Sequence, residues 1–142
     1  MSDAFDLERF VSAQASAYDR ALAEIRAGLK QSHWMWFVFP QYAGLGSSST
    51  AAHYAIRSRA EAEAYLQHPV LGARLRECAE AVCALKGRSA QEVFGYPDDM
   101  KLRSSATLFA SVSPPGSVFQ RVLDAFFDGA ADERTLALLH GR

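Results

Sequence analysis

Residues 33–49 read HWMWFVFPQYAGLGSSS and hold five of the sixteen aromatic side chains of the chain within nine positions. The aromatic part, residues 34–39, has the length of a buried strand but is equally compatible with a short buried helix. No partner strand is visible elsewhere in the sequence, and a lone strand is not stable. We therefore expect a short central helix or an extended buried segment, followed by a polar loop rich in glycine and serine.

The sequence on both sides of this stretch predicts helices with recognisable start and stop signals. Gly28 and Gly95 stand where helices should end, Ser89 and Asp132 where helices should begin, and Pro69 in a first helical turn. One or two helical turns are expected over 50–56. The longer helices are expected over residues 7–14, 16–28, 60–68, 69–85, 89–94, 98–112, 117–127 and 132–139.

The predicted fold is all-α. We expect residues 1–142 to form a single compact multihelical domain with an ordered core over residues 7–139. It should contain seven or eight mostly short helices around the short buried aromatic helix. Because several helices are short, a regular up-and-down bundle is not expected.

Composition and charge narrow the class of protein. The chain has 142 residues, 49% of them apolar and 22% charged, which is typical of a folded globular domain. A net charge of −1 argues against a nucleic-acid partner. The longest apolar run, residues 34–40, is too short to span a membrane, and the N-terminus lacks the pattern of a secretion signal. Two cysteines without a metal-binding spacing fit a reducing cytoplasm. We expect a cytoplasmic monomer or weak homodimer.

Familiar catalytic signatures are missing from the sequence. It contains no phosphate-binding loop, nucleophile elbow or zinc pattern, and its four histidines are not closely spaced. The sequence therefore predicts no metal site and no cofactor. Three clusters of polar residues remain as candidates for chemistry.

The first cluster lies at the edges of the aromatic stretch. His33 precedes the aromatic residues, and Gln41 and Tyr42 follow the turn at Pro40. Aromatic faces beside amide and hydroxyl donors suit a planar ligand such as a nucleobase. The alternative is that the aromatic residues only fill the core. The candidate ligand-binding residues of this cluster are His33, Trp34, Gln41, Tyr42, Gly46 and Ser47.

The second cluster is SSSTAAHY, residues 47–54. If the chain is helical from about Thr50, His53 and Tyr54 lie close to serine and threonine hydroxyls. Histidine titrates near neutral pH, so His53 is a candidate catalytic acid or base, and Tyr54 is a candidate ligand-binding residue. The alternative is that His53 makes only structural hydrogen bonds.

The third cluster is GYPDDMKLRSS, residues 95–105. On a helix that starts near Asp98, Lys101 and Ser105 lie on one face. Lys101 is a candidate catalytic residue, and Asp98 and Ser105 are candidate ligand-binding residues at a helix end that suits a phosphate or carboxylate. The alternative is that Asp98 and Lys101 simply form a surface ion pair.

These clusters lie within longer motifs that resemble a known family. Four motifs resemble the bacterial domain of unknown function 1810 family, sometimes labelled calpastatin-like: K.SHWMWF.FPQ with the following GLG at 30–47, Y.I.S..EA.AYL.HP.LG.RL.E at 54–77, FG.PDDMKL.SS.TLF at 94–109 and D..TL.LL at 132–139. The resemblance covers nearly the whole chain. It implies a single multihelical domain with an unusually short buried central helix, and it implies no catalytic residues.

A second similarity is to the NADAR family, helical proteins linked to N-glycosidic chemistry on ADP-ribose and riboflavin precursors. That family has a TSEHY-like motif after an aromatic segment, and STAAHY at 49–54 keeps its His-Tyr pair. Ala52 stands where the motif has glutamate, which removes a carboxylate suited to glycosidic cleavage. The similarity implies a nucleotide-like ligand.

The leading hypothesis is a small enzyme or ligand-binding protein for a nucleotide- or ADP-ribose-like compound. If it is an enzyme, the expected reaction is hydrolysis of an N-glycosidic bond, with His53 and Lys101 as catalytic residues. The alternative is a non-catalytic interaction domain whose aromatic stretch binds a peptide or a second subunit. That alternative predicts an exposed apolar patch at Trp34 or Trp36.

Overall fold

The computed structural model describes residues 3–141, and these residues form ten α-helices. Three of the helices have five residues or fewer: α3 (Met35–Val38), α4 (Ser49–His53) and α7 (Ala90–Phe94). The longer helices are α1 (Glu8–Ala15), α2 (Tyr18–Ala27), α5 (Arg59–Gln67), α6 (Leu71–Ala84), α8 (Asp98–Ser111), α9 (Val118–Phe126) and α10 (Glu133–Leu139).

The all-α prediction is confirmed. Residues 3–141 form ten helices, more than the seven or eight expected around the aromatic helix, because the segment expected as one or two helical turns near residue 50 forms the separate short helix α4. Most predicted bounds lie within one or two residues of the observed ones, which is the usual uncertainty of helix ends. The helix expected from Ser16, for example, begins at Tyr18, and Ser16 instead ends α1.

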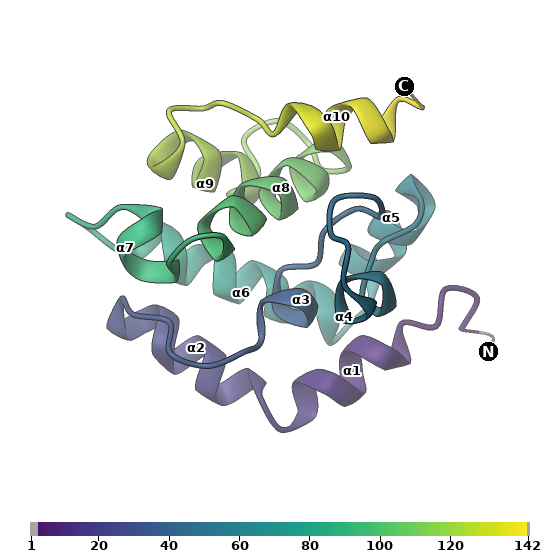
Figure 1. Cartoon of the computed structure of the whole chain (residues 1–142), viewed down its shortest axis with the longest axis horizontal. Helices are drawn as coiled ribbons and strands as arrows, with labels where there is room; N and C mark the ends of the chain where they lie inside the picture. The colour runs from purple at the N-terminus through teal and green to yellow at the C-terminus, as the bar shows by residue number, and fades with distance from the viewer. Residues whose placement is uncertain (1–2, 142) are drawn as a thin grey trace.

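The helices are arranged in layers (Figure 1). Helices α1 and α2 lie along one side, α6 runs through the middle, and α8, α9 and α10 lie on the opposite side. Helix α9 packs against both α6 and α8, and α10 packs against α8. Helix α3 lies near the centre of this arrangement, with the loop to α4 beside it.

The aromatic stretch forms the central part of the core. Residues 34–39 could form either a strand or a short helix, and the structure has the helix, α3, with Met35 and Val38 buried. Trp34 and Phe39 flank this helix and pack against Phe94 of α7, with ring centroids 6.3 and 6.2 Å from that of Phe94. The buried side chains join into one continuous cluster that includes residues from α1 to α9. Helix α3 is therefore held by packing rather than by its own four-residue length.

Several helices begin and end at the residues that the sequence predicts. Gly28 terminates α2 in the left-handed conformation, with φ of 76°. Ser89 and Glu92 form a reciprocal capping box at the start of α7. Asp98 does not cap its helix as Ser89 does. It lies in the first turn of α8, and Pro97 occupies the N-cap position, where no side chain makes a capping hydrogen bond. The carboxylate of Asp98 is thereby free to pair with other side chains.

Within residues 3–141, no helix is long and apolar enough to cross a membrane. Both cysteines are free, Cys78 inside the core and Cys83 half-buried. Burial raises the pKa of the Cys78 thiol to about 12, so this side chain behaves as a small apolar residue.

Candidate functional site

Two extended segments run side by side next to α4. The amide of Ala43 donates to the carbonyl of Ile56 at 2.8 Å, and the amide of Ile56 donates to the carbonyl of Gln41 at 2.9 Å. These bonds make an isolated parallel bridge between Tyr42 and Ile56. Ser48 then caps α4 by accepting a hydrogen bond from the amide of Ala51 at 3.0 Å. The polar loop predicted after the aromatic stretch is thus fixed at both of its ends.

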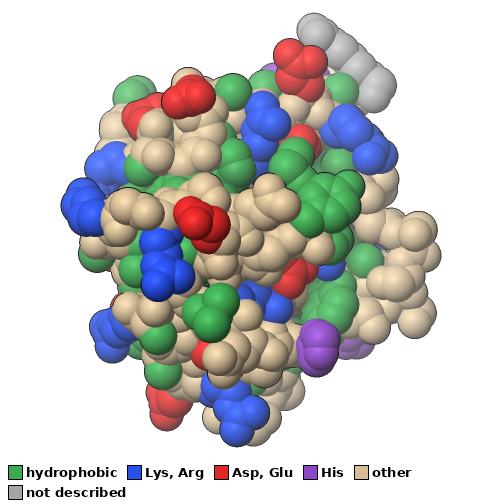
Figure 2. Space-filling model, turned by 60° about the vertical axis from the view of Figure 1, so that its left-hand side comes forward, with side chains coloured by type: hydrophobic (Ala, Val, Ile, Leu, Met, Phe, Trp, Pro, Cys, Tyr) green, Lys and Arg blue, Asp and Glu red, His purple; other side chains and the backbone are tan. Residues whose placement is uncertain are grey.

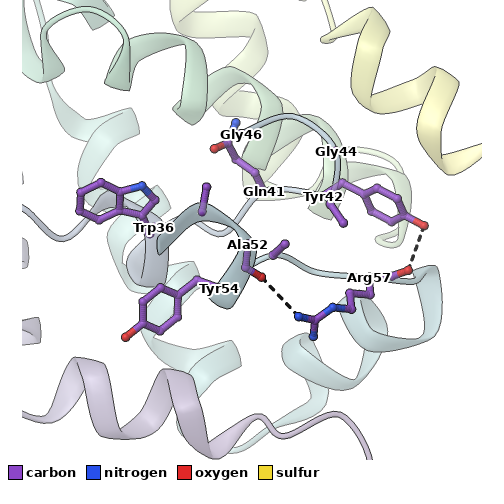
Figure 3. Close-up of a pocket in the computed structure, with 11 residues that line it drawn as sticks. Trp36, Gln41, Tyr42, Gly44, Gly46, Ala52, Tyr54 and Arg57 are labelled. Carbon is purple, nitrogen blue, oxygen red and sulfur yellow. Dashed lines mark hydrogen bonds between the residues drawn. The ribbon is translucent and has the colours of Figure 1, made fainter. Parts of the chain in front are cut away.

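A first cavity of about 170 Å³ lies between this loop, α3 and α4. Trp36 and Tyr54 stand at one end of it, and Tyr42 and Arg57 at the other (Figure 3). At that second end the Tyr42 hydroxyl donates to the carbonyl of Arg57, and the Arg57 guanidinium donates to the carbonyl of Ala52. The lining residues are Trp36, Gln41, Tyr42, Ala43, Gly44, Gly46, Ala51, Ala52, Tyr54, Ala55 and Arg57.

A second, more open cavity of about 440 Å³ lies on the other side of the same loop. It extends from the loop to the start of α8 and the start of α10. Lys101 and Arg134 bring positive charge to its wall, and Ser47 and Ser104 bring hydroxyl groups. Its lining residues are Gln41, Leu45, Gly46, Ser47, Tyr96, Pro97, Met100, Lys101, Ser104, Asp132 and Arg134.

Gln41 and Gly46 line both cavities, so the two form one double groove divided by the loop. Figure 3 shows the Gln41 side chain leaving the first cavity, and its amide donates to the Ser104 hydroxyl of α8 at 2.7 Å. The Lys101 ammonium lies 5.0 Å from the ring centroid of Trp36, in cation–π contact. The aromatic wall of the first cavity and the basic wall of the second are therefore in contact.

Several predicted site residues meet in this double groove. Gln41, Tyr42, Gly46 and Tyr54 line the first cavity, and Ser47 and Lys101 line the second. Asp98 joins them indirectly, because its Oδ1 lies 3.2 Å from the Lys101 ammonium. The surface ion pair proposed for Asp98 and Lys101 is therefore present, and it lies beside the groove.

The other predicted residues lie elsewhere. Trp34 is only 1% exposed and donates its indole N–H to Glu24, so it belongs to the core and not to a ligand pocket. Ser105 is also buried, because the face of α8 that carries it packs inward. His33 and His53 are exposed and line neither cavity; the His53 ring packs against Tyr54, with centroids 4.6 Å apart.

Sequence reasoning missed some lining residues. Trp36 lies within the aromatic run, where the alternative of a purely structural core residue applies to every aromatic side chain, and the sequence does not distinguish it from the buried Trp34. Asp132 and Arg134 lie at the start of α10, which packs against α8 and brings them to the groove. Nothing near them in the sequence indicates that position. The groove also includes Tyr96, Ser104 and Arg57.

On the face of the molecule shown in Figure 2, basic and acidic side chains are interspersed instead of gathering by sign. Among residues 3–141, no group of three or more histidine, cysteine, aspartate or glutamate residues is arranged to hold a metal ion.

Comparison with known proteins gives a family and a solved structure. The family model described as "Protein of unknown function (DUF1810)" matches residues 4–139. The crystal structure of the conserved hypothetical protein Rv1873 from Mycobacterium tuberculosis is similar, with 54% sequence identity and a TM-score of 0.95. The similarity covers 97% of this chain and 99% of that chain. No curated protein matches.

Proposed function

We propose that this chain, which belongs to the DUF1810 family of proteins of unknown function, binds a nucleotide-like compound in the double groove. One observation carries the proposal: the Lys101 ammonium of the second cavity lies 5.0 Å from the ring centroid of Trp36 in the first, so a basic wall and an aromatic wall adjoin across the loop. A nucleotide also has two such parts, a planar base and an anionic phosphate.

Each wall suits one of those parts. The rings of Trp36 and Tyr54 present apolar faces against which a planar base can stack. Lys101 and Arg134 present donors that suit phosphate oxygens. Ligand pockets commonly combine apolar walls with a few convergent polar groups in this way. The similarity of STAAHY to the NADAR motif supports the same class of ligand.

We propose hydrolysis of the N-glycosidic bond as the reaction to test with that ligand. Water would add to the anomeric carbon while the C–N bond breaks, and the base would leave with the bonding electrons and take a proton. Glycosidic cleavage commonly uses a carboxylate near the sugar. Asp132 lines the second cavity, as Lys101 does, and is our candidate for that group through Oδ1, because its Oδ2 accepts hydrogen bonds from Thr135. His53 lies outside the groove.

The interaction-domain alternative is less well supported by this geometry. It requires an exposed apolar patch on the aromatic stretch, but Trp34 is buried and Trp36 lines a cavity. We also propose a cytoplasmic location, because two free cysteines suit a reducing compartment. A monomer or weak homodimer remains our proposal for the oligomeric state.

Calorimetric titration with ADP-ribose, NAD and AMP tests the binding proposal. At least one of these compounds should bind the unaltered protein, and Lys101→Met should weaken that binding by about tenfold, because one charge-assisted contact is lost. Lys86→Met is the matched control, because Lys86 is exposed and lines neither cavity.

Two results would overturn the proposal. One is that none of the three compounds binds to the folded protein, and the other is that Lys86→Met weakens binding as much as Lys101→Met does. Release of free base or nicotinamide during the titration, followed by chromatography, tests hydrolysis separately. If a ligand binds and no base is released, binding stands and hydrolysis fails.

A further inference from the structure

Two lysines share one carboxylate beside the second cavity. Lys30 Nζ lies 2.8 Å from Asp98 Oδ2, and Lys101 Nζ lies 3.2 Å from Asp98 Oδ1. Each oxygen of the carboxylate therefore has its own ammonium partner. The three side chains carry two positive charges and one negative charge, so the cluster as a whole has one positive charge in excess.

Lys30 is the fixed member of this cluster. Its side chain is only 7% exposed, its ammonium donates to the carbonyl of Ser32 at 2.6 Å, and it lies 5.0 Å from the ring centroid of Trp34. Its own amide donates to the carbonyl of Val93. Lys30 lines neither cavity, so a ligand in the groove does not reach it.

Lys101 is the accessible member. Its side chain is 24% exposed, it lines the second cavity, and it lies over the ring of Trp36. If Asp98 were paired with Lys101 alone, the two charges would cancel next to the groove. Because Lys30 neutralises the carboxylate from the interior side, the excess charge is available where Lys101 meets the cavity.

The rest of the second cavity is compatible with an anion. Arg134 lines the same cavity as Lys101, and its guanidinium makes one long contact of 3.4 Å with the carbonyl of Gly44. Ser47 adds a hydroxyl group to this wall, whereas the Ser104 hydroxyl already donates to the carbonyl of Lys101. Asp132 is the opposing charge, but its Oδ2 already accepts bonds from the amide and hydroxyl of Thr135 at 2.9 and 2.6 Å. A phosphate group between Lys101 and Arg134 would match these donors.

We propose that the second cavity is a phosphate subsite, and that Lys30 is a positioning residue that acts through Asp98 to keep the charge of Lys101 available to the ligand. The inference rests on the proposed function and deepens it, because it assigns the phosphate or diphosphate group of the ligand to the second cavity and names the buried residue that keeps the charge of Lys101 available there.

The test uses inorganic pyrophosphate as the probe, titrated calorimetrically at fixed ionic strength into the full chain and its variants. Lys30→Met removes the buried charge, leaves Lys101 neutralised by Asp98, and should weaken binding by about tenfold. Lys30→Arg keeps the charge and should bind nearly as the unaltered protein does. Lys86→Met, at an exposed lysine away from both cavities, should have no effect.

The decisive variant is Lys30→Met/Asp98→Asn. It removes one charge of each sign and returns the cluster to one excess positive charge, so it should regain most of the affinity lost in Lys30→Met. Asp98→Asn alone leaves two ammonium groups without their carboxylate and should bind pyrophosphate more tightly than the unaltered protein. This second comparison keeps the test valid if Lys30→Met does not fold, which thermal unfolding would show.

The outcomes separate this inference from the proposed function. Failure of the double variant to regain affinity, or weaker binding by Asp98→Asn, would overturn the role of Lys30. Nucleotide binding without any pyrophosphate binding would overturn the phosphate subsite while leaving nucleotide binding in place. Pyrophosphate binding that follows the predicted order, together with no nucleotide binding, would support the subsite and overturn the proposed function.

Discussion

Arg9 and Glu61 form an ion pair in the interior of the protein, with Arg9 Nη2 2.7 Å from Glu61 Oε2 and side chains only 5% and 3% exposed. Arg9 also donates to the carbonyls of His53 and Ala55, both at 2.8 Å. The second oxygen of Glu61 accepts a hydrogen bond from the amide of Arg57. The pair thus connects α1 and α5 to residues 53–57, of which Tyr54, Ala55 and Arg57 line the first cavity.

Arg9→Met should lower the free energy of unfolding by about 3–5 kcal/mol, because it leaves the buried carboxylate of Glu61 without its cationic partner. Urea unfolding monitored by circular dichroism measures this loss. In Arg9→Met/Glu61→Gln no buried charge remains, so the double variant should lose less than the sum of the two single losses.

The matched control for that prediction is the exposed pair Arg121–Glu80. Its two charged atoms also lie 2.7 Å apart, but the side chains are 51% and 54% exposed. Arg121→Met should change the free energy of unfolding by no more than about 0.5–1 kcal/mol, because water screens the pair. Equal losses in Arg9→Met and Arg121→Met would contradict the role given to burial.

Gly46→Ala should close part of the double groove. A Cβ atom at this position would lie 2.5 Å from the Cβ of Ala51, so either the loop or α4 must move. We expect a loss of about 1–3 kcal/mol in the free energy of unfolding, which is typical of an added methyl group in a packed site, and weaker binding of the nucleotide-type ligand. Urea unfolding and calorimetry measure the two effects.

A compensating change tests whether the contact with Ala51 is the cause. Gly46→Ala/Ala51→Gly removes the opposing methyl group and should recover ligand binding. Its stability should recover only in part, because glycine within a helix costs about 1 kcal/mol relative to alanine. If binding stays weak in the double variant, the contact between these two residues does not control the groove.

The fold could be predicted largely because its signals are local. The hydrogen bonds that Ser89 and Asp132 make at the starts of α7 and α10 involve partners three residues away, so the sequence itself displays them. Local signals do not decide between strand and helix for residues 34–39. The decision depends on whether another segment could pair with them as a strand, and the lack of such a segment in the sequence correctly predicts the helix.

The candidate site could be predicted only in part, because tertiary packing decides which face of a helix reaches the groove. Residues of the loop, such as Gln41 and Gly46, are predictable as site residues because they lie in one short stretch of the sequence. Ser105 was expected on the same face as Lys101, but that position of α8 packs into the core and Ser104 lines the groove instead. Arg134 reaches the site only because α10 packs on α8.

The two tryptophans should report different environments. In Trp36→Phe the remaining indole, Trp34, is buried and bonded to Glu24, so its emission should be blue-shifted and resistant to acrylamide. In Trp34→Phe the remaining indole, Trp36, lines the first cavity, so its emission should be quenched by acrylamide and change when a nucleotide-type ligand binds. Steady-state fluorescence of both variants measures this difference. A ligand response from Trp34 but not from Trp36 would place the ligand elsewhere.

Acid stability should depend on Glu24, whose carboxylate holds the segment that carries Lys30 and Trp34. Partial burial raises the pKa of Glu24, but hydrogen bonds from Ser32, Gln31 and Trp34 outweigh that effect and lower it to about 2. Because the folded-state pKa lies below the ordinary value of 4.5, the stabilisation is fully present above that value. It should be lost as the pH falls toward 2.

Glu24→Gln should therefore lower the free energy of unfolding by about 2 kcal/mol at neutral pH, a value reduced from the full linkage energy because water partly screens the carboxylate. The difference between the variant and the unaltered protein should shrink as the pH falls from about 5 to about 2, since the protonated glutamate also loses its charge. Urea unfolding across that pH range measures this difference.

Glu63→Gln, at an exposed position of α5, is the control, and its free energy of unfolding should match that of the unaltered protein at every pH. A difference for Glu24→Gln that stays constant with pH would show that the carboxylate charge does not hold this segment.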